Sequence, residues 1–192
     1  MALSRTAMKT LARSAGASTP SMSVAARSQH TMANDKYMQT PEHYQYVLDK
    51  FTEHKACAVL RTPTASAAPK AMQAAVDGGF KLIEFTLTTP GCLDTLADFR
   101  EQHGNNLLTG CGTVMDIEDC KAAMDAGSEF LVAPCLVPEV VTWCRMHNIP
   151  IFPGCQTPSE AYAAYKAGAP VQKIFPGVAG GPMWGKAVSA AM

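Results

Sequence analysis

The chain has 192 residues, of which 47% are hydrophobic and 17% charged, and its 16 basic and 16 acidic side chains cancel. A chain of this length can bury roughly 70% of the surface that it exposes when unfolded, so one domain is expected. Zero net charge argues against a nucleic-acid partner or a polybasic membrane surface, and no apolar run reaches the ~18 residues of a membrane span. The seven cysteines form no C-x-x-C pair, which argues against a disulfide framework or a zinc site.

The charges are distributed unevenly. Residues 1–34 contain no acidic side chain but four basic ones, Arg5, Lys9, Arg13 and Arg27, which leaves 12 basic against 16 acidic residues in the remainder. An acid-free, arginine-containing and serine-rich start without a long apolar block is typical of an organellar transit peptide. We expect residues 1–34 to be a disordered leader for import into the mitochondrial matrix, with plastid import or a disordered cytosolic tail as alternatives.

An internal repeat organises residues 35–192. An Ala-Ala pair followed by the end of a helix occurs three times, and the copies finish at Gly79, Gly127 and Gly168. Glycine at this place is typical of a left-handed helix end. Apolar runs follow each copy and also lie between copies, which predicts six parallel strands that alternate with helices. The predicted strands cover residues 56–60, 80–85, 107–110, 130–134, 149–152 and 171–176.

The nearly constant unit length predicts an α/β fold of the closed (β/α)₈ barrel type, because no G-x-G-x-x-G follows the first strand as in a dinucleotide-binding sheet. A leading helix over 41–54 carries Tyr44, Val47, Leu48 and Phe51 on one face and is expected to plug the barrel floor. Strands that read as continuous apolar runs are expected to be buried on both faces. Polar residues gather at the carboxyl ends of the strands, where barrels place catalytic groups.

Lys173 and Glu84 both stand within predicted strands. A lysine is almost never fully buried unless it is paired or functional, and burial lowers the pKa of an ammonium group, as in Schiff-base lysines. Lys173 can also be an edge lysine that reaches solvent, and Glu84 can simply close an ion pair. Together they form a more specific pair, because an amine nucleophile needs a nearby proton shuttle.

Four segments carry a family resemblance: LIEFTLTTP at 82–90, TGCGTV at 109–114, FPGCQTPSE at 152–160 and KIFP at 173–176. In order and spacing they resemble the KDPG/KHG aldolases, which cleave 2-keto-3-deoxy-6-phosphogluconate and 4-hydroxy-2-oxoglutarate. The resemblance extends from about Lys55 to the end of the chain. It implies a class I aldolase on a (β/α)₈ barrel that forms a homotrimer and acts on a small-molecule keto acid. It also implies that no metal or other cofactor is needed, because a lysine imine with the substrate does the chemistry.

The resemblance implies a role for each matching residue. Lys173 would form the Schiff base with the pyruvoyl carbonyl, and Glu84 would act as general acid and base. Thr113 would help to hold the pyruvate carboxylate. Arg61 would lie in the active site, and Pro134 would line the pocket.

The resemblance also bears on the substrate. Many members have an arginine that binds the substrate carboxylate where this chain has Thr88, so Thr88 is a candidate substrate-binding position. The sequence Thr88-Thr89-Pro90 is closer to the branch that acts on 2-keto-3-deoxy-6-phosphogalactonate, in which Arg61 would make that contact. The implied reaction releases pyruvate with glyceraldehyde 3-phosphate from a phosphorylated sugar acid, or pyruvate with glyoxylate from 4-hydroxy-2-oxoglutarate.

Only 19 residues follow Lys173, enough for a loop over 177–182 and a sixth helix, so about six of eight βα units are expected in residues 35–192. Three explanations fit: a truncated gene model or transcript of a normal aldolase, a non-catalytic paralogue with a structural or interaction role, or a barrel completed by another chain. A different phosphosugar barrel enzyme, an isomerase or a synthase, would share the repeats but would not need Lys173 paired with Glu84.

Overall fold

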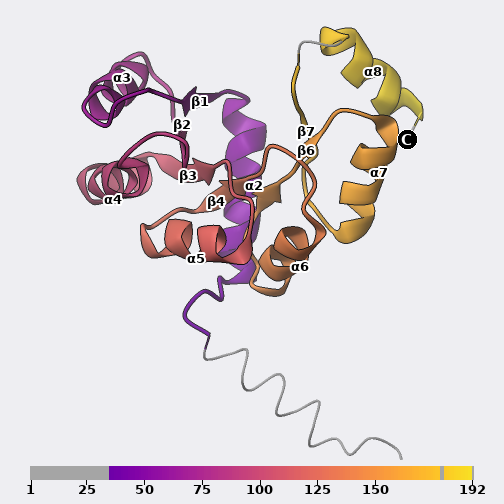
Figure 1. The fold of residues 1–192 in the computed structure, drawn as a ribbon, viewed down its shortest axis with the longest axis horizontal. Coiled ribbons are helices and arrows are strands. Elements are labelled where there is room, and N and C mark those ends of the chain that lie inside the picture. The colour runs from indigo at the N-terminus through magenta and orange to yellow at the C-terminus, as the bar shows by residue number, and fades with distance from the viewer. Residues whose placement is uncertain (1–34, 178–179, 192) are drawn as a thin grey trace, which may run out of the picture. The chain divides into compact units, whose positions relative to one another are not determined.

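A computed structural model describes residues 35–177 and 180–191 (Figure 1). The chain divides into two units, Met1–Lys36 and Tyr37–Met192, and every described helix and strand lies in the second. The expected leader over 1–34 lies outside the described residues.

Strands and helices alternate through the second unit, as the repeat predicts. A helix separates successive strands except β5 and β6. The strands are β1 (Cys57–Leu60), β2 (Leu82–Thr86), β3 (Leu108–Gly112), β4 (Phe130–Val132), β5 (Ile151–Phe152), β6 (Gly154–Cys155) and β7 (Lys173–Ile174). The helices are α2 (Pro41–His54), α3 (Ala67–Asp77), α4 (Cys92–His103), α5 (Ile117–Asp125), α6 (Pro138–Met146), α7 (Pro158–Ala167) and α8 (Gly181–Ala191), with a 3₁₀ turn η1 (Gly104–Asn106).

The recorded strand pairs are all parallel. Strands β1 to β5 form one sheet in chain order, and β6 pairs with β7. Only Pro153 separates β5 from β6, and the N–H of Gly154 donates to the carbonyl of Ala133 at 2.9 Å, so β6 continues the fifth strand past the end of β4. The described residues therefore supply the six predicted βα units, and helices α3 to α7 lie outside the strands (Figure 1).

Burial differs between the inner and outer strands of this arrangement. Strands β2 to β6 are buried along their length, whereas Val59 of β1 is 53% exposed and both residues of β7 are half-buried. The expectation of burial on both faces is therefore wrong for β1 and β7, because each has a strand neighbour on one side only within the described ranges. The predicted strand 171–176 shortens to Lys173–Ile174, and Pro176 has no N–H with which to continue it.

The three repeat glycines end their helices as predicted. Gly79, Gly127 and Gly168 have φ values of 99°, 92° and 96°, in the left-handed region that favours glycine. The chain turns there and enters the next strand.

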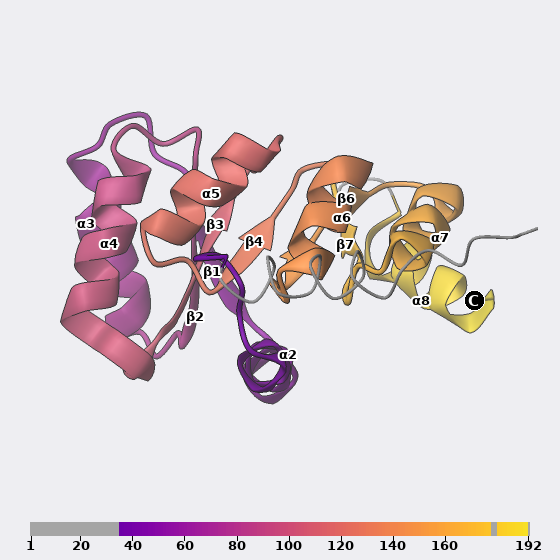
Figure 2. The same ribbon diagram turned by 90° about the horizontal axis from the view of Figure 1, so that it is seen from below.

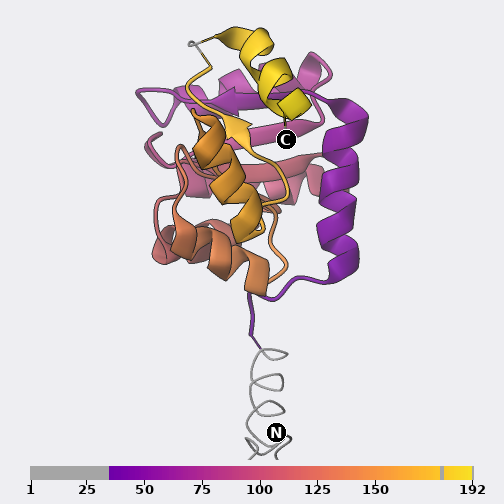
Figure 3. The ribbon, with the colours of Figure 1, turned by 90° about the vertical axis from the view of Figure 1, so that its right-hand side faces the viewer.

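The predicted floor helix is confirmed. Val47 of α2 is fully buried, and the ring of Phe51 meets Phe130 and Phe152 edge-on, with ring centroids 4.9 and 4.7 Å apart. Leu82 and Leu108, at the starts of β2 and β3, belong to the same apolar cluster. Helix α2 thus closes the amino ends of the strands, and Figures 2 and 3 show it lying across one end of them.

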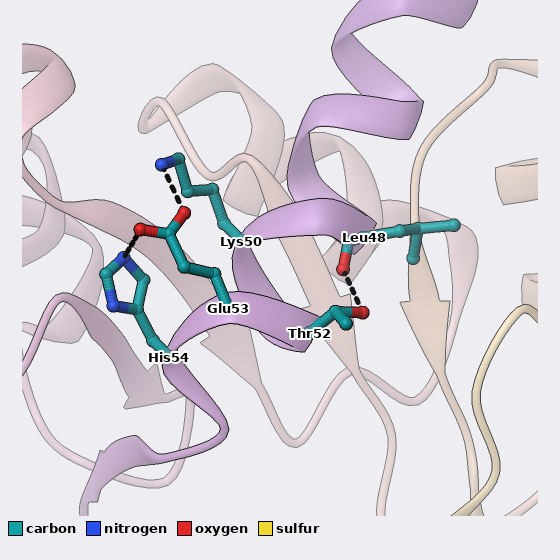
Figure 4. A network of polar contacts seen from close by, with 5 residues as sticks. All are labelled: Leu48, Lys50, Thr52, Glu53 and His54. Carbon is teal, nitrogen blue, oxygen red and sulfur yellow. Dashed lines mark hydrogen bonds and ion pairs between the residues drawn. The ribbon is translucent and has the colours of Figure 1, made fainter.

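The outward side of α2 carries a small polar network (Figure 4). The carboxylate of Glu53 pairs with Lys50 Nζ at 2.7 Å and lies 3.8 Å from His54 Nε2. The hydroxyl of Thr52 donates to the carbonyl of Leu48 at 3.1 Å. Because exposed ion pairs contribute little, the helix is held mainly by its apolar face.

Candidate active site

Strand β2 places Glu84 inside the barrel. Successive residues of a strand face opposite sides. Ile83 and Phe85 join the apolar cluster beneath the outer helices, whereas Leu82 joins the inner cluster on α2. Glu84, two residues after Leu82 on the same face of the strand, therefore points inward, and only 4% of it is exposed.

Two glycines of β3 make room for its neighbours. A Cβ at position 112 would lie 2.7 Å from Cδ of Glu84 and closer still to Oε1, so the carboxylate lies directly over Gly112. A Cβ at position 110 would lie 2.5 Å from Cε1 of Phe130 and closer to two other ring carbons. The two glycines of TGCGTV thus leave a stretch of β3 without side chains, against which the Glu84 carboxylate and the Phe130 ring pack.

Burial controls the charge of Glu84. It raises the pKa of this carboxyl above its ordinary value, and the positive charges of Lys173 and Arg61 counteract the shift only in part. No hydrogen bond to its carboxylate is recorded from any residue of the described ranges. Because its pKa is raised, this carboxyl group holds its proton to a higher pH than an exposed carboxyl does, which suits a group that must act as a general acid and then as a base.

Lys173 stands on β7 beside Gly154 of β6 and is half-buried. Its backbone N–H donates to the carbonyl of Pro153 at 3.0 Å, and Nζ lies 5.0 Å from the centroid of the Phe175 ring. The charges of Lys173 and Glu84 both act on Cys57, whose pKa burial raises to about 12. The two residues singled out from the sequence therefore share one electrostatic environment inside the barrel.

Arg61 follows β1, and its side chain is exposed. The peptide groups on either side of it are hydrogen-bonded to side chains at and just after the end of β2. The Thr86 hydroxyl donates to the carbonyl of Leu60 at 3.1 Å, and the N–H of Thr62 donates to the Thr89 hydroxyl at 3.1 Å.

The remaining predicted residues also lie at carboxyl ends of strands. Thr113 follows β3, is half-buried and has a φ of 66°. Pro134 follows β4, and its carbonyl packs so closely on Gly154 that a Cβ there would lie 2.4 Å from the carbonyl carbon. Within the described ranges, neither side chain hydrogen-bonds to Glu84 or Lys173. Thr88 is exposed, and its hydroxyl lies 3.2 Å from that of Thr86.

Two residues of this arrangement do not stand out in the sequence. Thr86 and Thr89 are each 2% exposed and hold the chain around Arg61, yet no sequence pattern assigns them a role. The available signal is a group of threonines at and just after the end of β2. Gly112 was noticed only as part of a motif, and nothing in the sequence showed which side chain lies over it.

Other features of the described residues contribute no chemistry to this site. A cavity of about 560 Å³ lies elsewhere, lined by Tyr162, Tyr165, Gln172, Ser189 and Ala191. No three His, Cys, Asp or Glu side chains gather as metal ligands in the part of the chain that the structure describes. No helix within residues 35–177 and 180–191 is long and apolar enough to cross a membrane.

Comparisons with known proteins point to one family. The family model described as KDPG and KHG aldolase matches residues 47–191. The 2-dehydro-3-deoxy-6-phosphogalactonate aldolase of Escherichia coli is 33% identical over 135 residues, which cover 70% of this chain and 66% of that enzyme.

Solved structures agree with this result. A native KDPGal structure superposes with a TM-score of 0.65 at 33% identity and covers 71% of this chain. A KDPG aldolase from Legionella pneumophila, with pyruvate captured at low pH as a covalent carbinolamine intermediate, superposes with a TM-score of 0.62 at 28% identity and also covers 71% of this chain. The chain spans 66% of the length of each of these relatives, just under two thirds. With the family model matching about three quarters of it, the chain belongs to the KDPG and KHG aldolase family.

Proposed function

We propose that the chain is a class I aldolase, a carbon-carbon lyase that works through an imine on Lys173. One observation carries the proposal: a carboxyl group buried inside a barrel, Glu84, lies in the field of a half-buried strand lysine. A lysine that forms an imine needs a group nearby that can both give and take protons.

The chemistry begins with bond formation at the keto carbon. The free amine of Lys173 adds to the C2 carbonyl, and the proton that the attacking nitrogen loses passes to the carbonyl oxygen, which gives a neutral carbinolamine. Protonated Glu84 gives a second proton to that hydroxyl, which leaves as water, and a positively charged imine remains. The raised pKa of Glu84 supports this step, because the protonated carboxyl persists closer to neutral pH.

Cleavage follows from the imine. Glu84, now a carboxylate, removes the proton of the C4 hydroxyl, the C3–C4 bond breaks, and its electron pair moves through C3 and C2 to neutralise the imine nitrogen. The aldehyde product leaves, C3 of the enamine takes a proton, and water hydrolyses the resulting imine to pyruvate and free Lys173. The protonated imine accepts the electron pair far better than the carbonyl would.

The substrate proposed is a 2-keto-3-deoxy-6-phospho sugar acid, which would yield pyruvate and glyceraldehyde 3-phosphate, or 4-hydroxy-2-oxoglutarate, which would yield pyruvate and glyoxylate. The names of the relatives support this class. Thr113 would help to hold the pyruvate carboxylate, and Pro134 would line the pocket. Arg61, at the end of β1, would also contact the carboxylate, and Thr88 would contact the substrate from the end of β2.

The test is reductive trapping. Folded protein is treated with pyruvate and borohydride, and the expected result is a stable adduct on the peptide that contains Lys173. Lys173→Met should abolish the adduct, whereas Lys81→Met, which removes an exposed lysine immediately before β2, should leave it intact. A folded wild-type protein without an adduct would contradict the proposal and favour a non-catalytic, structural or interaction role.

We propose separately that residues 1–34 direct import into the mitochondrial matrix, with plastids as the alternative. Their acid-free, arginine-containing composition supports this proposal. A fluorescent protein fused behind these residues should enter mitochondria, and cytosolic fluorescence would contradict the proposal.

We also propose that the protein assembles as a homotrimer, which the family resemblance supports. Light scattering after size-exclusion chromatography should give three times the chain mass. A monomer mass at micromolar concentration would contradict it.

A further inference from the structure

Three threonines form one cluster at the carboxyl end of β2. The hydroxyls of Thr88 and Thr89 lie 3.2 and 3.3 Å from that of Thr86. Thr86 and Thr89 are almost fully buried, whereas Thr88 is exposed. We call Thr86, Thr88 and Thr89 the threonine cluster.

Proton counting gives the hydrogen bonds of the cluster a direction. A hydroxyl has one proton to donate. Thr86 donates its proton to the carbonyl of Leu60, so it accepts from Thr89, and Thr89 in turn accepts from the N–H of Thr62. A continuous relay therefore runs from the Thr62 peptide through two hydroxyls to the Leu60 peptide.

This relay encloses Arg61. Both peptide groups beside Arg61 are fixed, although its side chain is exposed and its charge acts on Glu84. A loop tip that presents an arginine would otherwise be free to move, because its neighbours Thr62 and Pro63 lie outside the strand. Losing a hydroxyl from the buried relay would leave a peptide group without its partner, which costs more than an exposed hydrogen bond.

We infer that Thr86 and Thr89 are positioning residues for Arg61: they hold the end of β1 so that the guanidinium stays at the barrel mouth, where it binds the carboxylate of the keto acid. The substrate part of this inference rests on the proposed aldolase function. The relay gives Thr86 and Thr89 a role that is separate from the substrate contact proposed for Thr88.

The experiment compares Thr86→Val and Thr89→Val with Thr86→Ser and Thr89→Ser in the full chain. Valine keeps the shape and removes the hydroxyl, and serine keeps the hydroxyl. Thr109→Val is the matched control, because Thr109 is buried in the neighbouring strand and its hydroxyl has no hydrogen-bond partner in the described structure. The readouts are amide hydrogen exchange of the 60–62 segment and the pyruvate concentration that gives half-maximal trapping on Lys173.

Thr89→Val, which removes the acceptor of the Thr62 amide, should exchange that amide at least about tenfold faster. Both valine variants should raise the half-maximal pyruvate concentration about tenfold, with the maximal trapping rate little changed. The serine variants and Thr109→Val should match the wild type. In an Arg61→Ala background, Thr89→Val should add no further increase in the pyruvate requirement. A merely structural threonine would lower stability without this dependence on Arg61.

Each contrary result has one meaning. If wild-type protein forms no adduct, the proposed function fails, and the relay is judged by amide exchange alone. If the adduct forms but the valine variants keep the wild-type pyruvate requirement, the inference is overturned and the proposed function stands. Unchanged Thr62 exchange in Thr89→Val also overturns it. Should a valine variant not fold, the alanine variant at the same position is measured instead, and a wild-type pyruvate requirement there overturns the inference equally.

Discussion

Gly112→Ala should slow imine formation on Lys173 about 100-fold while leaving the protein folded. The added methyl group would lie 2.7 Å from the carboxyl carbon of Glu84 and closer to Oε1, where ordinary contacts between such atoms are about 3.5 Å. The carboxylate therefore has to retreat by about 1 Å. A displacement of this size at a reacting group can reduce the rate about 100-fold, which corresponds to about 2.7 kcal/mol of activation free energy.

The cost in stability should be small, because the colliding atoms are at the end of a rotatable side chain. Gly110→Ala is the matched control on the same strand. Its methyl group would meet the ring of Phe130, which is fully buried and held by Phe51 and Phe152. Overpacking of this kind costs about 1–3 kcal/mol of unfolding free energy, or about 2–4 °C in Tm for each kcal/mol.

The assay measures the rate of pyruvate trapping on Lys173 and the thermal unfolding of both variants. Gly112→Ala should lose rate and keep its Tm, and Gly110→Ala should lose Tm while the folded fraction still reacts. A Gly112→Ala protein that traps pyruvate at the wild-type rate would refute the reasoning, because the carboxylate position would then not matter.

Three further predictions concern stability. Burial raises the pKa of Glu84 in the folded protein, so the folded state holds its proton more tightly than the unfolded chain and loses stability as pH rises from the ordinary carboxyl value towards the raised one. Glu84→Gln should therefore have a higher Tm than wild type at pH 8, and the difference in Tm should vanish below about pH 4. Equal Tm values at pH 8 would contradict this prediction. Arg100 pairs with buried Glu129 at 3.0 Å, so Arg100→Met should lower the unfolding free energy by about 3 kcal/mol in urea titrations. The double variant Arg100→Met/Glu129→Gln should regain most of this stability, because no unpaired charge remains buried. A double variant as unstable as the single one would exclude the unpaired charge as the cause. The Thr157 hydroxyl accepts a hydrogen bond from Glu160 N at 3.2 Å in the capping box of α7. Thr157→Ala should lower the unfolding free energy measured in urea by about 1 kcal/mol, and Thr157→Ser should lower it hardly at all. Equal losses in the two variants would argue against the cap.

The repeat was the most reliable guide to the fold. The glycines at 79, 127 and 168 were predicted to end helices in the left-handed conformation, and all three do, because only local backbone geometry decides this. Strand ends were less predictable. Pro176 limits the strand predicted over 171–176 at its carboxyl end, but the start at Lys173 depends on pairing with β6, which lies elsewhere in the sequence.

The residues of the candidate site were easier to predict than their contacts. Glu84 and Lys173 stand out in the sequence because charged residues are unusual within a buried strand, whereas the inward direction of Glu84 follows only from the clusters that its strand neighbours join. The contact between Glu84 and Gly112 depends on how β2 and β3 align, and the relay around Arg61 depends on how β2 aligns with β1. The sequence of one strand does not specify how it aligns with its neighbour. The roles of Gly112, Thr86 and Thr89 therefore follow only from the three-dimensional arrangement.

The floor helix also constrains the order in which the protein can fold. Every recorded strand pair joins neighbours along the chain, so the sheet can grow one unit at a time as synthesis proceeds. Among the described elements, helix α2 is synthesised first, yet Phe51 packs against rings of β4 and β5, about eighty to a hundred residues later. The apolar face of α2 therefore stays exposed until most of the sheet has been synthesised. During that interval we expect it to be a binding surface for chaperones.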